Sequence, residues 1–303
     1  MRIRRSSVYK KPLIQKEFKT VQEQIELLES RGLSISDKEL AATFLLENNY
    51  YRISGYSLTL RNNDVFFPSA TFNNIIDIYT FDQELRHILM KYIEIIEVKL
   101  KSCYAHEFSR QFGPEAYLSS QFFTDPIKHS EIFAKSEKLK LQRKPHEAFL
   151  KHFIDELNAP VPLWAYVELF SIADISILYK ISTPEFKPSV AKYFNLKDKP
   201  WLLENFMHSM TILRNLCAHG SRIYNRLFEQ KPKLAKEEKL LLRTLEDGTI
   251  DNSHLFSFIL IMRRLLSESD FSKLTAEIST LSNKISFVDL SYYGFPNNWS
   301  NLI

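Results

Sequence analysis

The chain has 303 residues, enough for one large domain or two small ones, and its 45% hydrophobic and 25% charged residues are typical of a soluble globular protein. The formal net charge of +4 does not require a nucleic-acid partner, so any surface that binds RNA or DNA must come from local clustering of Lys and Arg. Only six glycines occur, which favours helices, because sheets and tight turns use glycine freely.

Other classes of protein are excluded by the cysteines and the apolar runs. Cys103 and Cys217 each lie in a helical apolar pattern, which predicts small buried side chains in a reducing compartment. No Cys/His spacing suits zinc, and we expect neither a metal nor another cofactor. The basic start lacks the apolar segment of a secretory signal, and the strongest apolar run, 255–262, is too short to span a bilayer. We therefore expect a cytoplasmic protein with no membrane partner.

The first third of the chain predicts a basic arm followed by helices. Residues 1–15 are rich in Arg and Lys. A capping box at Thr20–Glu23 predicts the start of a helix that ends at Gly32, and a second helix is predicted over Ser36–Asn48. Near residues 50–68 the helical period fails, which indicates an irregular segment or a short β-hairpin.

The rest of the chain predicts further helices in an all-α fold. Apolar residues keep a helical period over 71–112, and Gly113 ends this long helix. Prolines and a lysine cluster at 135–144 indicate a less ordered connecting region over 124–162. The later helices are predicted at 163–180, shortly before Phe194, and at 200–220, 234–246, 251–268 and 270–285. We expect a single domain, residues 1–303.

Residues 214–226 read RNLCAHGSRIYNR and contain the strongest candidate site. Arg214 continues the apolar stripe of Met207 and Met210, so it needs a carboxylate, a phosphate or carbonyls as partner. His219 lies about 140° further round an ideal helix, so the two side chains do not converge on a straight helix. Two solutions remain open: Gly220 ends the helix and releases His219, or a symmetric dimer completes the site.

The chemistry that fits these residues is attack of a ribose 2′-hydroxyl on the adjacent phosphate, which needs no metal. His219 has the right pKa range to move a proton, Arg214 stabilises charge on phosphate, and Asn215 orients either group. Candidate RNA contacts are Arg222 and Arg226 for flanking phosphates and Tyr224 for base stacking. The alternative is structural: a histidine near the carbonyl end of a helix, and an arginine in a core salt bridge with a residue such as Glu168.

Several segments resemble, in the same order, the Abi-type abortive-infection proteins of bacteria, the AbiD/AbiF-like group. Besides Leu213–Arg226, the resemblance rests on YKKPL (9–13), ELLESRGLSI (26–35), NYYRISGY (49–56), FDQELRHIL (81–89), PLWAYVELFSIADISILY (162–179) and YGFPNNW (293–299). It covers nearly the whole chain.

That group looks like a branch of the HEPN ribonucleases, which are helical bundles that cleave RNA without metal through an Arg-x4-6-His motif, usually as dimers. The resemblance implies that Arg214 binds phosphate, Asn215 is the polar residue after it, and His219 transfers the proton. Trailing family positions match Arg222, Tyr224 and Asn225. The chain departs from the family at Gly220, Ala173 and Tyr224, where a bulkier or polar residue, a glycine and a tryptophan are common.

A second segment repeats the pattern of the first. Leu100–His106 (LKSCYAH) aligns with Leu213–His219 as Leu, cation, polar residue and Ala-His. We hypothesise a second half-site made by Lys101 and His106. The alternative is coincidence on an amphipathic helix, in which Lys101 simply pairs with Glu97 at i,i+4 spacing.

The leading prediction is a metal-independent endoribonuclease in bacterial defence against phage, with RNA as substrate and a homodimer as the working state. A non-catalytic RNA-binding or regulatory helical module is the first alternative, and a helical interaction protein is the second. A neutralising antitoxin or small RNA is a further possible partner.

Overall fold

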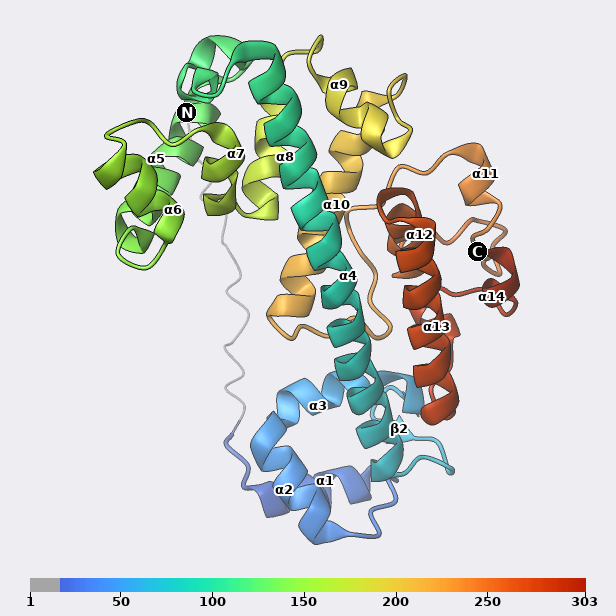
Figure 1. Ribbon diagram of the computed structural model, residues 1–303. Coiled ribbons are helices and arrows are strands. Elements are labelled where there is room, and N and C mark those ends of the chain that lie inside the picture. Colours follow the sequence, from blue (N-terminus) through green and yellow to red (C-terminus); the bar gives the residue numbers. More distant parts are fainter. Residues whose placement is uncertain (1–16) are drawn as a thin grey trace, which may run out of the picture. The chain divides into compact units, whose positions relative to one another are not determined.

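The computed structural model describes residues 17–303, so the predicted basic arm at 1–15 lies outside the described part. The fold is mostly helical, as expected: the described part contains fourteen α-helices and one two-stranded antiparallel sheet (Figure 1). The chain divides into two compact units, Met1–Ile76 and Asp77–Ile303, which are described separately. That residues 1–303 form one domain stays a prediction. No helix of the described range has the length and hydrophobicity that crossing a membrane requires.

The first unit packs short helices around a small apolar core. Its buried side chains include Ile25, Leu45, Tyr56 and Phe72. Its elements are α1 (Val21–Ser30), α2 (Lys38–Asn48), α3 (Tyr50–Tyr56), η1 (Leu58–Leu60), β1 (Arg61–Asn62), β2 (Val65–Phe66) and the start of α4 (Phe72–Phe112).

The capping box at the start of α1 is confirmed, because Glu23 N–H donates to Thr20 Oγ1 at 3.3 Å and Thr20 N–H donates to Glu23 Oε2 at 2.6 Å. The second helix is capped by Asp37, whose side chain accepts the N–H of Leu40 at 2.9 Å. The capping residue therefore lies one position later than the predicted Ser36, because a carboxylate caps a helix as well as a hydroxyl does.

The predicted hairpin is present but shorter than the irregular segment that indicated it. Strand β1 pairs with β2 in the register Arg61 to Phe66 and Asn62 to Val65. Asn63, in the two-residue turn, has a φ of 53°, a conformation that asparagine tolerates well. Tyr50–Tyr56, by contrast, forms helix α3, whose first turn is capped by the side chain of Asn49.

Most of the long helix α4 belongs to the second unit and supplies much of its core. Its inward side chains recur at helical spacing and are at most 1% exposed: Phe81, Leu85, Leu89, Tyr92, Ile96, Leu100, Tyr104 and Phe108. This confirms the apolar stripe that predicted the helix. Gly113, with a φ of 99°, follows its last residue.

The region 124–162 is more regular than predicted. It contains α5 (Pro126–Arg143), α6 (Ala148–Lys151) and the single π turn η4 (His152–Glu156). Asp125 caps α5 by accepting the N–H of Lys128 at 2.9 Å. Pro126, taken as a sign of disorder, fits the first helical position, where no N–H is needed.

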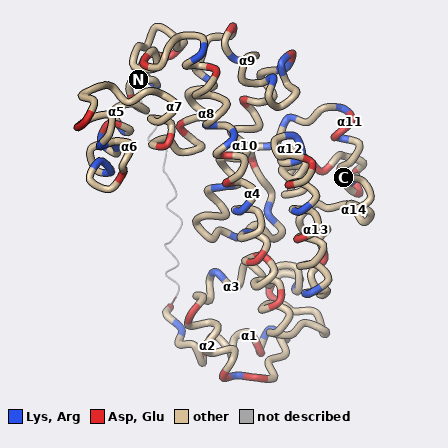
Figure 2. Tube along the Cα trace, in the orientation of Figure 1, with Lys and Arg blue, Asp and Glu red and all other residues tan. Residues whose placement is uncertain are grey.

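Three lysines of the cluster at 135–144 are paired with carboxylates. Lys135 pairs with Asp174 at 2.9 Å, and two more pairs join Lys140 to Glu137 at 2.5 Å and Lys144 to Asp155 at 2.5 Å. Basic and acidic residues are also interspersed along the other elements (Figure 2). These pairs offset part of the positive charge of the cluster.

Helix α10 (Pro200–Ala218) packs against α8, α9 and α12, while α12 also packs against α13. The predicted helix 163–180 is broken at Phe170–Ser171, where Ser171 caps a new helix. The predicted helix at 234–246 shrinks to one turn. The other elements are η2 (Ala116–Leu118), η3 (Ser120–Phe122), α7 (Leu163–Tyr166), η5 (Val167–Leu169), α8 (Ile172–Ile181), α9 (Lys187–Ala191), η6 (Lys192–Phe194), α11 (Lys236–Lys239), α12 (Phe256–Leu265), α13 (Glu268–Lys284), η7 (Leu290–Tyr293) and α14 (Trp299–Leu302).

Candidate functional site

Helix α10 carries the predicted cation and imidazole at its C-terminal end. Met207 and Met210 are fully buried on its inner face, while Arg214, which continues their row, is half-buried. Asn215 is exposed. Burial of the apolar stripe therefore sets the rotation of the helix and places Arg214 at the border between core and solvent.

The helix ends at His219–Gly220, which was one of the two solutions that the sequence left open. Gly220 has a φ of 61°, and its N–H donates to Cys217 O at 3.0 Å. The next N–H, of Ser221, donates to Leu216 O at 2.8 Å. This pair of bonds is a Schellman motif, which favours glycine because a side chain strains the left-handed conformation. His219 is the capping residue, and its side chain is exposed.

Arg214 does not form the core salt bridge with Glu168 that the structural alternative offered. Glu168 lies exposed on η5, and no ion pair joins it to Arg214. Among the ion pairs within residues 17–303, none involves Arg214. A half-buried guanidinium in this setting has its charge and its donors available for an anionic ligand.

The chain after His219 is anchored to α4 by the buried carboxylate of Asp82. This carboxylate accepts the N–H of Tyr224 at 2.7 Å and the N–H of Ile223 at 3.3 Å. It also accepts the hydroxyl of Tyr293 at 3.0 Å and pairs with the buried guanidinium of Arg86. Three segments far apart in the sequence, at 81–86, 221–224 and 293, therefore meet at one buried charge.

The sequence analysis missed the buried pair of Asp82 and Arg86. The available signal was the spacing of the two residues, four apart within an otherwise apolar helical stripe, because i,i+4 partners of opposite charge face each other on a helix. A buried carboxylate that accepts two backbone N–H groups holds a loop as firmly as secondary structure does.

The prediction that Tyr224 stacks on an RNA base is wrong for this structure. Its side chain is 2% exposed. Its ring packs against Tyr292 at a centroid distance of 5.3 Å and edge-on against Tyr293 at 5.5 Å. The ring is covered because η7, almost 70 positions later, folds over it, so Tyr224 serves the core.

The other trailing residues hold the turn in which they lie. Arg222 donates through Nη1 to the carbonyl of Tyr224, and Arg226 Nη1 donates to Arg222 O at 3.3 Å. Asn225 has a φ of 46°, and its N–H donates to Tyr292 O at 3.1 Å. Both arginines are half-buried. Contact of their remaining N–H donors with RNA phosphates stays a prediction.

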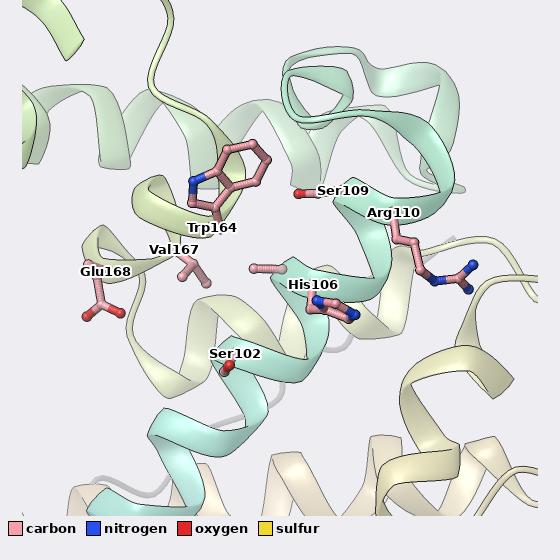
Figure 3. Close-up of a pocket in the computed structure, with 8 residues that line it drawn as sticks. Ser102, His106, Ser109, Arg110, Trp164, Val167 and Glu168 are labelled. Carbon is pink, nitrogen blue, oxygen red and sulfur yellow. The ribbon is translucent and has the colours of Figure 1, made fainter.

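The second segment, Leu100–His106, lies inside α4 and not at a helix end. Lys101 pairs with Glu97 at 3.2 Å, as its structural alternative predicted. His106 is exposed and lines a pocket of about 460 Å³ between α4 and the α7–η5 segment (Figure 3). No residue of 213–226 lines this pocket, so the structure does not join the two segments there.

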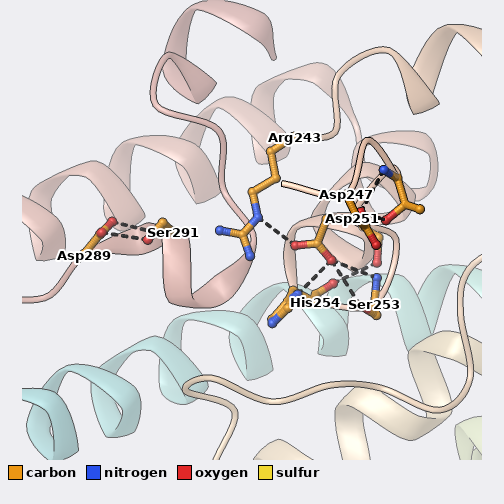
Figure 4. A network of polar contacts seen from close by, with 9 residues as sticks. Arg243, Asp247, Asp251, Ser253, His254, Asp289 and Ser291 are labelled. Carbon is orange, nitrogen blue, oxygen red and sulfur yellow. Dashed lines mark hydrogen bonds and ion pairs between the residues drawn. The ribbon is translucent and has the colours of Figure 1, made fainter. Parts of the chain in front are cut away.

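A further network of polar contacts joins Arg243, Asp251 and His254 and holds the chain before α12. Asp251 is buried and accepts Nε of Arg243 at 2.7 Å, while Nδ1 of His254 lies 2.7 Å from its other oxygen (Figure 4). Burial acts to raise the pKa of Asp251, but the bonds from His254 and Arg243 outweigh it and hold this pKa well below its usual range. A Cβ on Gly294 would lie 2.5 Å from Cβ of His254, so the backbone needs glycine there.

The end of α10 therefore offers a permanent cation and an exposed imidazole, the two groups that cleavage of a phosphodiester by its own 2′-hydroxyl requires. Cys217 lies between them but is no nucleophile, because burial raises the pKa of its thiol to about 12. Residues 17–303 contain no group of three His, Cys, Asp or Glu side chains placed to hold a metal ion.

Comparison with known proteins identifies a family. The sequence model of the family described as Abi-like protein matches residues 43–225, which include the end of α10 and its anchor on α4. No curated protein and no solved structure matches the chain significantly.

Proposed function

The chain belongs to the Abi-like protein family, and from this premise we propose that it is a metal-independent endoribonuclease of the HEPN type that acts in abortive infection. Its substrate is RNA, and its catalytic groups are Arg214, Asn215 and His219. One observation carries the proposal: a guanidinium with no ion-pair partner within residues 17–303 lies on the same helix end as an exposed imidazole.

Each group has a defined part in the reaction. His219 accepts the proton of the attacking 2′-hydroxyl or supplies one to the leaving 5′-oxygen, since an imidazole changes charge near neutral pH. Arg214 binds the phosphate and stabilises the charge that develops on its oxygens. Asn215, exposed beside Arg214, hydrogen-bonds the phosphate or orients the imidazole. The products are a 2′,3′-cyclic phosphate and a free 5′-hydroxyl.

The buried anchor supports the proposal because a catalytic imidazole has to be held in place. Asp82 fixes the backbone at 223–224, and the Schellman motif fixes His219–Gly220 immediately before it. Both ends of the short segment that follows the imidazole are therefore restrained. Rigid support of this kind is what positions a general acid or base within reach of its substrate.

The proposal includes a homodimer in which two copies share one cleft. The resemblance to the HEPN ribonucleases implies a dimer, and a symmetric dimer brings the same helix end of two copies together. Mixing Arg214→Ala protein with His219→Ala protein tests this directly. If each site takes its arginine and histidine from different copies, mixed dimers regain one intact site, or roughly a quarter of the wild-type rate after random exchange. A site contained within one copy regains nothing.

Incubation of the purified protein with total RNA and excess EDTA tests the activity itself. We expect cleavage by the wild type and a loss of about 10²–10⁴-fold in His219→Ala, with about 10²–10³-fold in Arg214→Ala. His208→Ala is the matched control, because His208 is also exposed on α10 but lies outside the motif. This control should cleave at the wild-type rate.

The same experiment separates the competing functions. A folded His219→Ala protein that still cuts RNA would contradict the catalytic assignment. RNA binding that disappears in Arg214→Ala, with no cleavage by any protein, would favour the regulatory RNA-binding module. Unfolding of both variants would favour a motif that only braces the core. Circular dichroism on every variant distinguishes this last outcome.

A further inference from the structure

The pocket between α4 and the α7–η5 segment, about 460 Å³ in volume, is not used by the proposed cleavage (Figure 3). Its apolar lining includes the buried side chains of Ala105 on α4 and Val167 on η5. This volume lies in the range of pockets that bind small molecules, and an apolar lining is also typical of such pockets.

Trp164 stands at one end of this pocket and is 57% exposed, although its neighbours Leu163 and Tyr166 are buried. An indole with this much exposed surface beside an apolar lining provides a stacking face for an aromatic ring. The neighbouring residues of α7 bury their side chains in the core, so the short helix is fixed and the indole is presented from a rigid support.

A hydroxyl close to the indole has no partner. Ser109 Oγ is shielded from solvent and makes no hydrogen bond within residues 17–303, although it lines the pocket. A buried hydroxyl without a partner is unfavourable, and a ligand that carries both donors and acceptors on one edge would satisfy it. Ser102 and Glu168 add further polar groups to the lining.

The charges of the pocket favour a base over a phosphate. Arg110 is the lining residue with a permanent positive charge, and its guanidinium is engaged by buried Glu107, through Nη2 at 2.7 Å and Nε at 3.1 Å. Glu168 adds a negative charge to the lining, which repels phosphate but accepts the amino hydrogens of a nucleobase.

We propose that this pocket binds an unpaired nucleobase, stacked on Trp164 and hydrogen-bonded by Ser109. The base comes from one of two sources: a single-stranded stretch of RNA, in which case the inference rests on the proposed ribonuclease function, or a free nucleotide. The recognition chemistry is the same for both sources. In the first case the pocket fixes a base away from the bond that is cut and so contributes to the choice of cleavage site.

Binding measurements with the full chain test this inference. One set of probes is AMP, GMP, CMP and UMP, and the other is a fluorescein-labelled, single-stranded 2′-O-methyl RNA of mixed sequence. Trp164→Ala should weaken binding of at least one probe by roughly 5- to 150-fold, and Ser109→Ala by roughly two- to tenfold. Trp201→Ala is the matched control, because Trp201 is 53% exposed on α10 and does not line the pocket.

The pattern of results identifies the source of the base. Trp164-dependent binding of mononucleotides supports a free nucleotide, and Trp164-dependent binding of the strand alone supports an RNA base. Equal affinity of wild type and Trp164→Ala for every probe overturns the inference, as does an equal loss in Trp201→Ala.

Failure of this inference is distinguishable from failure of the ribonuclease proposal. The 2′-O-methyl probe cannot be cleaved through its 2′-oxygen, so its binding is independent of catalysis, and His219→Ala should bind it as the wild type does. Cleavage with no Trp164-dependent binding would contradict the proposal for the pocket but not the ribonuclease proposal. Trp164-dependent binding without any cleavage would contradict the ribonuclease proposal but not the proposal for the pocket.

Discussion

Leu213–His219 and Leu100–His106 share a sequence pattern but have different environments. In the first segment, Gly220 follows the histidine and ends the helix. Arg214 of this segment takes part in no ion pair among the described residues. In the second, Glu107 follows the histidine, the helix continues, and Lys101 is paired with Glu97. The difference shows that the residue after the histidine and the charges one turn away decide what the pattern can do.

The largest expected effect concerns the anchor of the first segment. Asp82→Asn keeps the shape of the side chain but removes the negative charge that pairs with the buried Arg86. We expect the free energy of unfolding, measured by urea denaturation, to fall by about 3–5 kcal/mol. Glu131→Gln is the control, since its pair with Lys128 is exposed and should cost about 1 kcal/mol or less. Similar losses in both variants would contradict the anchoring role.

Directly after the second segment lies a buried carboxylate, Glu107, whose contribution to stability should depend on pH. Burial acts to raise the pKa of Glu107, but hydrogen bonds from Arg110, Tyr193 and Lys192 outweigh it and lower this pKa to about 2. The folded state therefore favours the charged form: the stabilisation is complete above pH 4.5, the ordinary value, and is lost as the pH falls towards 2.

Glu107→Gln should accordingly lower the free energy of unfolding at pH 7 by about 2 kcal/mol. The gap between wild type and variant should narrow as the pH falls from 4.5 towards 2.5, when measured by denaturation across this range. A gap that is constant with pH would mean that packing, and not charge, accounts for the contribution of Glu107.

Gly220→Ala should alter the end of α10 while leaving its core face intact. A side chain at a φ of 61° costs about 1–2 kcal/mol. Gly248→Ala is the control, because Gly248 has a φ of 80° and open space around its Cβ position. Both variants should lose similar stability in urea, but only Gly220→Ala should lose more than about tenfold in cleavage rate, because it displaces His219. Equal cleavage by the two would contradict the role of this helix end.

The smallest effect is expected at Lys101, where the half-site hypothesis is tested. If its pair with Glu97 is only structural, Lys101→Ala should cost about 0.5 kcal/mol or less in urea denaturation. Cleavage of RNA by Lys101→Ala and by His106→Ala should then match the wild type. A loss of more than about tenfold in both, with the fold intact, would instead make the second segment a half-site.

Local features of the sequence predicted the local structure well. The end of α10 was predictable because a glycine that follows a helical apolar stripe commonly takes the left-handed conformation that ends a helix. The buried stripe of α4 followed from its period. The order of α5 was underestimated because proline is a breaker inside a helix but fits its first turn, where Pro126 lies.

Features that depend on distant segments could not be predicted. Tyr224 is covered by η7 and bonded to Asp82, and neither neighbour is close to it in the sequence. The same holds for Trp164, whose exposure beside the unsatisfied hydroxyl of Ser109 depends on how α7 packs on α4. Periodicity identifies which face of an element is buried but not which other segment covers it.

The most direct test of the proposed activity is the analysis of RNA ends, by mass spectrometry, after digestion in excess EDTA by the wild type, His219→Ala and His208→Ala. We predict 2′,3′-cyclic phosphate ends from the wild type and from His208→Ala, and none above background from a folded His219→Ala protein. Two results would contradict the claim that the end of α10 is a metal-independent ribonuclease site. One is that His219→Ala forms cyclic phosphate ends at the wild-type rate, and the other is that the wild type does not cleave RNA in EDTA.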